Sequence, residues 1–220
     1  MLINLRNALM AGKRNPTAKD YPTLPDVFFF DAIENSGYKT HDATAATWKN
    51  LVATNNLTLT GGRSWLDDAL YLDGTGGAKN DNWTTSPSTV EFVCTPERSS
   101  TTEILFGTGD PNMFGVKGNG GGMVFNVNYA VPGVFTDLPR TFAVAFTSDS
   151  RAYINGVATA TVAGATFNYM YMRVEVGRRY TGTANYFKGK VHAYRAHSRA
   201  LTADEIAANY AVDKARFGLP

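Results

Sequence analysis

Most of the chain alternates hydrophobic and polar positions with a period of two. In the segment 141–147, the large residues Phe142, Val144 and Phe146 share one side of an extended strand, with small residues opposite. This alternation predicts strands that place one face in a core and the other toward solvent or a binding surface. About a dozen such segments follow Val27, more than one open, twisted sheet usually holds, so two packed sheets are expected.

Turn residues separate these predicted strands at short intervals. The clearest turn is Asn155-Gly156, between Ile154 and Val157. Asn-Gly is the favoured pair for a two-residue turn, because both central residues must adopt positive φ. The sequence therefore predicts a β-hairpin at this point.

The N-terminal 25 residues break the period of two. Leu2, Leu5 and Leu9 recur at helical spacing, so we expect a short amphipathic helix over residues 1–12. Residues 13–25 have the basic and proline-rich composition of a linker. We therefore divide the chain into an N-terminal helix and linker, residues 1–25, and a β-sandwich domain, residues 26–220. The helix would pack on its own domain or assemble with another copy, and the sequence leaves both open.

A second helix is predicted at the C-terminus. Thr202 and Glu205 form a capping box, in which each side chain satisfies a backbone amide of the first turn. Ile206, Tyr210 and Phe217 then repeat at helical spacing, and Gly218 fits just beyond the helix end. This helix is expected to pack on the sandwich.

Composition narrows the function classes. The net charge is only +2, which gives no reason to expect nucleic acid or a membrane surface as a partner. The single cysteine, Cys94, excludes an intrachain disulfide framework and is expected to be buried. Arg6 and Asn7 interrupt what would be the apolar core of a signal peptide. The localisation is therefore unknown, with a virion or a bacterial surface favoured.

Several short blocks occur in a recognisable order. They include Leu72-Asp73-Gly74, Tyr153-Ile154-Asn155-Gly156, the segment 187–195 and Arg199-Ala200-Leu201 before the capping box. Together they resemble the concanavalin A-like lectin/glucanase superfamily in its laminin-G-like branch, over about residues 26–218. The resemblance implies an all-β fold: a two-sheet antiparallel jelly-roll sandwich with short N-terminal and C-terminal helices.

Two further details qualify this resemblance. The segment Trp48-Lys49-Asn50-Leu51 is similar to the family's early W-x-D-L block, but Asn50 replaces the aspartate and puts that carboxylate's contact in question. Residues 5–13 resemble the openings of phage or prophage tail-type proteins of gut bacteria.

The spacing of acidic residues argues against an enzyme. Glucanases of this fold carry alternating carboxylates on one strand, because acid and nucleophile must flank the sugar. Glu91, Glu103 and Glu175 each stand alone in their strands and are expected to be turn or surface residues. His192 and His197 differ by an odd number and should face opposite sides, so no zinc site is predicted.

A sugar site needs an exposed aromatic face flanked by hydrogen-bonding side chains. Three clusters meet this description, namely Trp83 with Asn82, Tyr129 with Asn126 and Asn128, and Tyr180 with Arg178 and Arg179. Calcium is the one metal that the sequence leaves open, through Asp110 and Asn112, and no other cofactor is expected. The basic residues of the segment 173–199, Arg195 among them, are expected to form a solvated strand face.

The sequence thus predicts a non-catalytic carbohydrate-binding or adhesion module whose partner is a carbohydrate or cell-surface glycan. The alternative is a structural or assembly component of a phage, in a tail or as particle decoration, that associates with itself through the N-terminal helix. A glycoside hydrolase is the third and weakest reading of the family.

Overall fold

The computed structural model of the protein describes residues 15–83, 87–97, 103–109, 112–117, 122–125, 129–131, 139–149, 151–161, 172–177 and 186–220. For the strand residues between 103 and 131, and for residues 160, 161, 172 and 173, only the backbone is described. The helix predicted over residues 1–12 lies outside these residues.

The described strands form two antiparallel sheets of eight strands each. We call the first of these sheet A. Its strands, in spatial order, are β14 (Val157–Thr161), β13 (Arg151–Ile154), β12 (Phe142–Thr147), β7 (Thr89–Pro96), β16 (Lys188–His197), β5 (Leu70–Asp73) and β4 (Arg63–Trp65), with β1 (Phe28–Asp31) also paired to β16.

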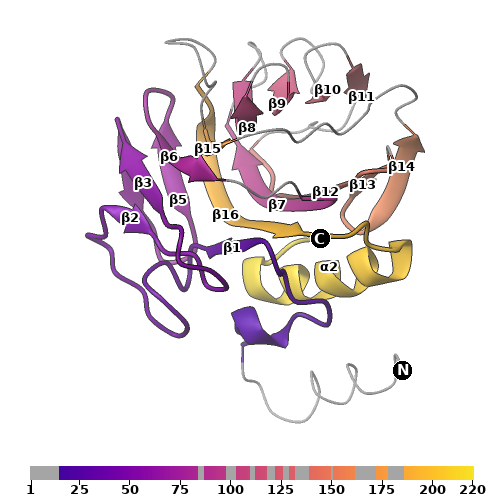
Figure 1. Cartoon of the computed structure of the whole chain (residues 1–220), viewed down its shortest axis with the longest axis horizontal. Helices are drawn as coiled ribbons and strands as arrows, with labels where there is room; N and C mark the ends of the chain where they lie inside the picture. Colours follow the sequence, from indigo (N-terminus) through magenta and orange to yellow (C-terminus); the bar gives the residue numbers. More distant parts are fainter. Residues whose placement is uncertain are drawn as a thin grey trace.

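The second sheet, sheet B, faces sheet A. Its strands, in spatial order, are β11 (Tyr129–Val131), β10 (Gly122–Phe125), β9 (Asn112–Lys117), β8 (Glu103–Gly109), β15 (Met172–Val176), β6 (Gly77–Trp83), β3 (Leu57–Thr60) and β2 (Thr47–Trp48). Figure 1 shows β8 to β11 on one side of β7, β12 and β16, and the C-terminal helix on the other. The predicted two-sheet, jelly-roll-like sandwich is confirmed.

Aromatic side chains fill the space between the sheets. Phe28 contacts Tyr194 and Trp83, with ring centroids 4.4 and 5.1 Å apart, and Phe92 stacks on Tyr194 at 4.7 Å. Such pairs prefer tilted, offset or edge-on geometry, which these rings adopt. Cys94 lies in the same core, where burial raises the pKa of its thiol to about 12, as expected for an inert cysteine.

The predicted C-terminal helix is present as α2 (Ala203–Phe217). Thr202 and Glu205 form the expected capping box, and Gly218 ends the helix in the left-handed conformation with φ 65°. α2 lies along the outer face of sheet A, next to the short helix η1 (Ala18–Asp20), as Figure 1 shows. These two helices therefore cover part of the outer face of sheet A.

The Asn-Gly hairpin is also confirmed and helps to position α2. Asn155 and Gly156 have φ values of 50° and 77°, which the turn between β13 and β14 requires. A Cβ atom at Gly156 would lie 2.9 Å from the ring of Tyr210 in α2. The hairpin therefore packs directly against the helix.

The segment predicted as a linker is docked on the domain over residues 15–25, which we call the N-terminal strap. Tyr21 is buried, and its hydroxyl donates to Asp213 Oδ1 at 2.6 Å. The backbone amide of Thr23 donates to Asn209 Oδ1 at 3.2 Å. The composition that suggested a linker does not reveal these contacts, because prolines and basic residues give no sign that a tyrosine has a partner 192 residues away.

Asn50, at the position that the resemblance had put in question, makes two contacts with backbone amides. Its side-chain oxygen accepts hydrogen bonds from the backbone amides of Phe29 at 3.0 Å and Val52 at 3.2 Å. An amide oxygen serves these two donors as a carboxylate oxygen would. Asn50 therefore links β1 to the segment after β2 through its oxygen, while its buried side-chain nitrogen has no hydrogen-bond partner among the described residues.

A β-bulge in β16 overturns the expectation for the two histidines. Val191 pairs with Cys94 and Ala193 pairs with Val93, so His192 is the extra residue. The bulge places His192 on the outer side of sheet A, 5.4 Å from the ring of Phe217. Both histidines therefore lie on the side that α2 covers, whereas strict alternation would have separated them.

Candidate functional site

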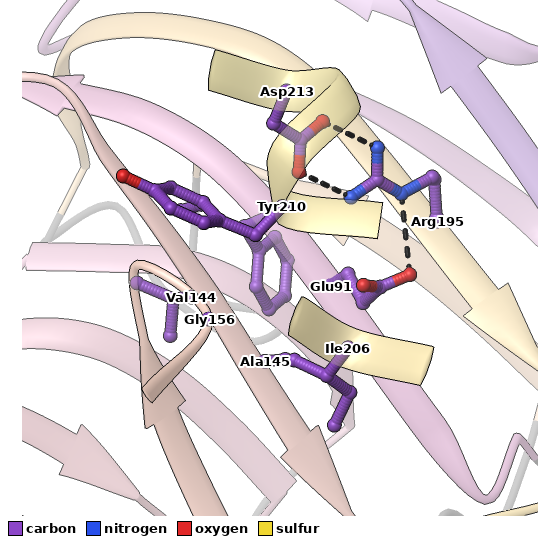
Figure 2. A pocket seen from close by; sticks show the side chains of 10 residues that line it. Glu91, Val144, Ala145, Gly156, Arg195, Ile206, Tyr210 and Asp213 are labelled. Carbon is purple, nitrogen blue, oxygen red and sulfur yellow. Dashed lines mark hydrogen bonds and ion pairs between the residues drawn. The ribbon is translucent and has the colours of Figure 1, made fainter. Parts of the chain in front are cut away.

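Charged side chains are buried where α2 packs on sheet A. Arg195 of β16 forms two hydrogen bonds with Asp213 of α2, at 2.6 and 2.7 Å, and its Nε lies 3.3 Å from Glu91 Oε2 (Figure 2). The same Glu91 oxygen lies 2.8 Å from His197 Nε2 and accepts from Asn209 Nδ2 at 3.1 Å. Strands and helix are thus joined by charge-assisted hydrogen bonds.

A second group of charges lies at the C-terminal end of α2. Arg216 contacts Asp31 Oδ2 at 2.7 Å and Glu34 Oε1 at 3.3 Å. It also donates to the carbonyl oxygen of Pro16, while Ala18 N donates to Glu34 Oε1 at 2.7 Å. The N-terminal strap is therefore bound to the same charges as α2.

Tyr21 connects the two groups. Its hydroxyl binds Asp213, and the Arg195 guanidinium lies 4.2 Å from the centre of its ring. A cation over an aromatic face is stabilised further when both are desolvated, as they are here. We call the joined groups the buried ion cluster, which comprises Tyr21, Asp31, Glu34, Glu91, Arg195, His197, Asn209, Asp213 and Arg216.

The environment shifts the acidic groups of the cluster in different directions. Burial raises the pKa of Asp31 to about 6, although the charge of Arg216 opposes the shift. Burial would also raise the pKa of Glu91, but Arg195 and the hydrogen bond with His197 outweigh it, so this pKa lies below its usual value. Glu91 therefore stays ionised, whereas Asp31 takes up a proton around pH 6. Burial also raises the pKa of Asp213, although Arg195 opposes this shift.

The raised pKa of Asp31 gives a testable pH dependence. A group whose folded pKa is raised contributes stability below its unfolded pKa and loses it as pH rises through the folded pKa. We expect the free energy of unfolding of the wild type, relative to Asp31→Asn, to fall between about pH 4 and pH 6 and to level off above. Urea denaturation of both proteins across this range measures the difference, and a difference that rises with pH would contradict the assignment.

The cavity beside the cluster is too small for a sugar. Its volume is about 10 Å³, close to the space that one water needs. Figure 2 shows Val144, Ala145, Ile206 and Tyr210 closing it on the side away from the charges. Pockets for organic ligands are usually some 300 Å³ or larger. The cluster is therefore a packed element of the fold.

The two carboxylates in Figure 2 also lack the freedom that acid–base chemistry needs. Glu91 and Asp213 both bind Arg195, whose guanidinium fills the space between them. A glycosidase pair must instead leave room for the sugar or a water between its carboxyl groups. What this arrangement does is hold α2 and the strap to sheet A.

These positions correct two expectations from the sequence. Glu91 and Glu175 are 3% and 1% exposed, so they are not surface residues. Arg195 is 1% exposed and does not belong to a solvated strand face. The physical reason at Glu91 and Arg195 is the same: α2 covers the outer face of sheet A, and it supplies partners that alternation within a strand cannot show.

Trp83 was the wrong aromatic to propose for a sugar platform. It is 5% exposed and packs edge-on against Phe28, so its ring faces the core. Neighbouring Asn82 is exposed, but its backbone amide is engaged with Asn80 Oδ1 at 2.8 Å. A sugar cannot stack on Trp83 in this position.

The other candidates do not gather with Asn82 into one site. Tyr129 lies on β11 and Asn82 on β6, five strands away in sheet B, which corresponds to about 24 Å across the sheet. Asn112 opens β9, and only its backbone is described. Six further candidates lie outside the described residues, namely Asp110, Asn126, Asn128, Arg178, Arg179 and Tyr180.

Sequence reasoning missed the cluster, but the helix carried a signal. Asn209, Asp213 and Arg216 follow Ile206 at spacings of three and four, so they share its buried face. Polar residues on a buried helix face require partners, and Glu91 sits opposite on β7. The pattern indicates that these helix residues have buried partners, but it cannot show which residues of the distant strands those partners are.

The fold is a two-sheet antiparallel β-sandwich that the cluster braces on one side with a helix. Residues 73–207 match the family described as the concanavalin A-like lectin/glucanases superfamily, which is more than half of the chain. The chain belongs to this superfamily. A comparison with curated proteins finds no match.

Solved structures agree with this placement. Domain 4 of AbnA, an extracellular GH43 arabinanase of Geobacillus stearothermophilus solved with arabinotriose, matches with a TM-score of 0.62 and 18% identity, over 84% of this chain and 97% of that domain. Trypanosoma rangeli sialidase in complex with 2,3-difluorosialic acid matches with the same TM-score and identity, over 86% of this chain and 33% of the enzyme. The chain thus spans about a third of the sialidase, and at this identity the likeness is one of fold.

Proposed function

We propose that this protein is a non-catalytic carbohydrate-binding module. The observation that carries the proposal is the ion cluster packed between α2 and the outer face of a concanavalin A-like sandwich. The ionisable groups that α2 and sheet A bring together are bound to one another around a cavity of about 10 Å³. No acid–base pair open to a substrate is found among the residues whose side chains are described.

The ligand class is supported by a similar domain. Domain 4 of the arabinanase was solved with arabinotriose, and 97% of that domain aligns with this chain. A module of this kind binds an oligosaccharide through aromatic and hydrogen-bonding side chains. Asn126, Asn128, Tyr129 and the segment 178–180 remain the proposed sugar contacts, and Asp110 with Asn112 remains the proposed calcium site.

The proposal is tested by measuring binding and turnover with the full 220-residue chain. We expect binding on an array of plant, bacterial and animal glycans, confirmed by calorimetry with the best oligosaccharide, and no release of reducing sugar from the same compound. Repeating the calorimetry with EDTA tests calcium, since loss of binding that calcium restores would assign the ion.

Two results would count against this function. Release of reducing sugar that a single carboxylate replacement abolishes would make the protein a glycoside hydrolase. Failure to bind any glycan, together with assembly into oligomers that deletion of residues 1–12 abolishes, would favour a structural component of a phage.

A further inference from the structure

A row of polar side chains crosses the part of sheet A that α2 leaves open. In register they are Ser64 of β4, Tyr71 of β5, Lys190 of β16 and Thr95 of β7, followed by Thr141 just before β12. Ser64 is exposed and the other four are partly exposed, whereas these strand neighbours belong to the core: Trp65, Leu70, Leu72, Cys94, Phe142 and Val191. We call these five residues the polar strip.

The strip borders the C-terminal end of α2. Phe217 and Leu219 pack on Val93, Ala143 and Ala193, which occupy the next positions along the same strands. The covered part of the outer face is therefore apolar, and the open part is polar. The C-terminal residues form one edge of the open surface.

Hydrogen bonding orients the hydroxyl groups of the strip. His192 Nδ1 lies 2.9 Å from the carbonyl oxygen of Asp68, which can only accept, so Nδ1 carries a proton. In the neutral ring, Nε2 then accepts from the Thr95 hydroxyl at 2.9 Å. Thr95 Oγ1 lies 2.8 Å from Thr141 Oγ1 and accepts from it in turn. The lone pairs of the Thr141 hydroxyl are left to accept from a ligand.

The aromatic ring and the charges of the strip are fixed in a similar way. The Tyr71 hydroxyl donates to Glu97 Oε2 at 3.3 Å, and Lys188 Nζ lies 3.6 Å from the same carboxylate. The Glu97 carboxylate beside the ring is therefore paired with a lysine. Within the described part of the chain Lys190 makes no hydrogen bond or close ion pair, and the carboxylate that its charge acts on is Asp68. Next to Thr141, Arg140 adds a second exposed cation.

We infer that the polar strip binds a saccharide that carries a carboxylate group. The Tyr71 ring provides a surface for the C–H face of a sugar, the threonine hydroxyls pair with sugar hydroxyls, and Lys190 pairs with the carboxylate. Charge complementarity selects the acidic ligand, because two cations, Lys190 and Arg140, border the strip, whereas the nearby carboxylates are already engaged. Glu97 is paired with Lys188, and Asp68 lies 3.5 Å from His192 Nδ1. This inference rests on the proposed function and places a ligand away from the sheet B candidates.

The test uses the full chain, uronic acid and sialic acid oligosaccharides, and neutral oligosaccharides of the same length. We expect Tyr71→Ala to weaken binding of the acidic sugars about tenfold and Lys190→Gln to weaken it by a similar factor. Lys190→Gln should leave the binding of neutral sugars unchanged, and added salt should reproduce its effect. Lys49→Gln is the matched control, because Lys49 is an exposed lysine that directly follows β2. Urea midpoints verify that each variant is folded.

The outcomes separate this inference from the proposed function. If acidic sugars bind and both strip variants weaken them, the inference is supported. If sugars bind but the strip variants have no effect, or if only neutral sugars bind, the inference is overturned and the proposed function stands. If no sugar binds to the wild type, both fail.

Discussion

Replacing Arg195 with methionine is expected to lower the free energy of unfolding by about 3–5 kcal/mol. Arg195 is 1% exposed and binds both Glu91 and Asp213, so its loss leaves two buried carboxylates without their shared cation. Because methionine fills much of the same volume, the loss of unfolding free energy measures mainly the removal of the positive charge. Urea unfolding at neutral pH measures the effect.

Two comparisons make this result specific. Arg199→Met removes the partner of Glu205 at the surface, where solvent screens the pair, and should leave stability unchanged within error. Replacing Arg195, Glu91 and Asp213 together by apolar residues should recover part of the loss, because no charge then remains buried without a partner. An Arg195→Met protein as stable as the wild type would show that the cluster does not hold α2 in place.

The sequence pattern predicts the strands, the hairpin and the C-terminal helix well, because each depends on residues that are close together in the sequence. The alternation at Phe142, Val144 and Phe146 gives a buried strand, the pair Asn155-Gly156 gives the hairpin, and Thr202 caps the helix. Each feature is decided by residues within a few positions of one another. No knowledge of distant contacts is needed.

The buried ion cluster could not be predicted in this way, because its members are far apart in sequence. Arg195 meets Glu91 across 104 positions, and Arg216 meets Asp31 across 185. Alternation marked Glu91 as pointing away from the core, which is correct, but solvent was the wrong assumption for that side. Because α2 covers this part of the outer face of sheet A, a side chain that points away from the sandwich core is buried under the helix.

The bulge at His192 shows the same limit at the candidate binding surface. A single inserted residue moves this side chain to the outer face, where it orders the hydroxyls of Thr95 and Thr141. Counting by twos from His197 cannot detect the insertion. The residues of the polar strip lie side by side only because of how β16 pairs with β7 and β5, and the sequence pattern does not show this pairing.

Replacing Tyr21 with alanine is expected to cost about 3–5 kcal/mol, the usual range for a fully buried aromatic residue. The change removes the ring that packs on Phe29 and faces Arg195, together with the hydroxyl bound to Asp213. Burial raises the pKa of the Tyr21 hydroxyl, so it stays a proton donor at neutral pH. Tyr21→Phe keeps the ring and should cost only about 1–2 kcal/mol.

Because Tyr21 anchors the N-terminal strap, its loss should also free the strap locally. Trypsin under native conditions should then cut after Lys19 faster in Tyr21→Ala than in the wild type, with Tyr21→Phe between them. Leu24→Ala, at a half-exposed residue of the same strap, is the control and should match the wild type. Equal cleavage rates and stabilities in all four proteins would mean that the strap is held by its backbone contacts with Asn209 and Glu34. Cleavage that is slowest in the wild type, faster in Tyr21→Phe and fastest in Tyr21→Ala would instead show that the ring and the hydroxyl of Tyr21 hold the strap on the domain.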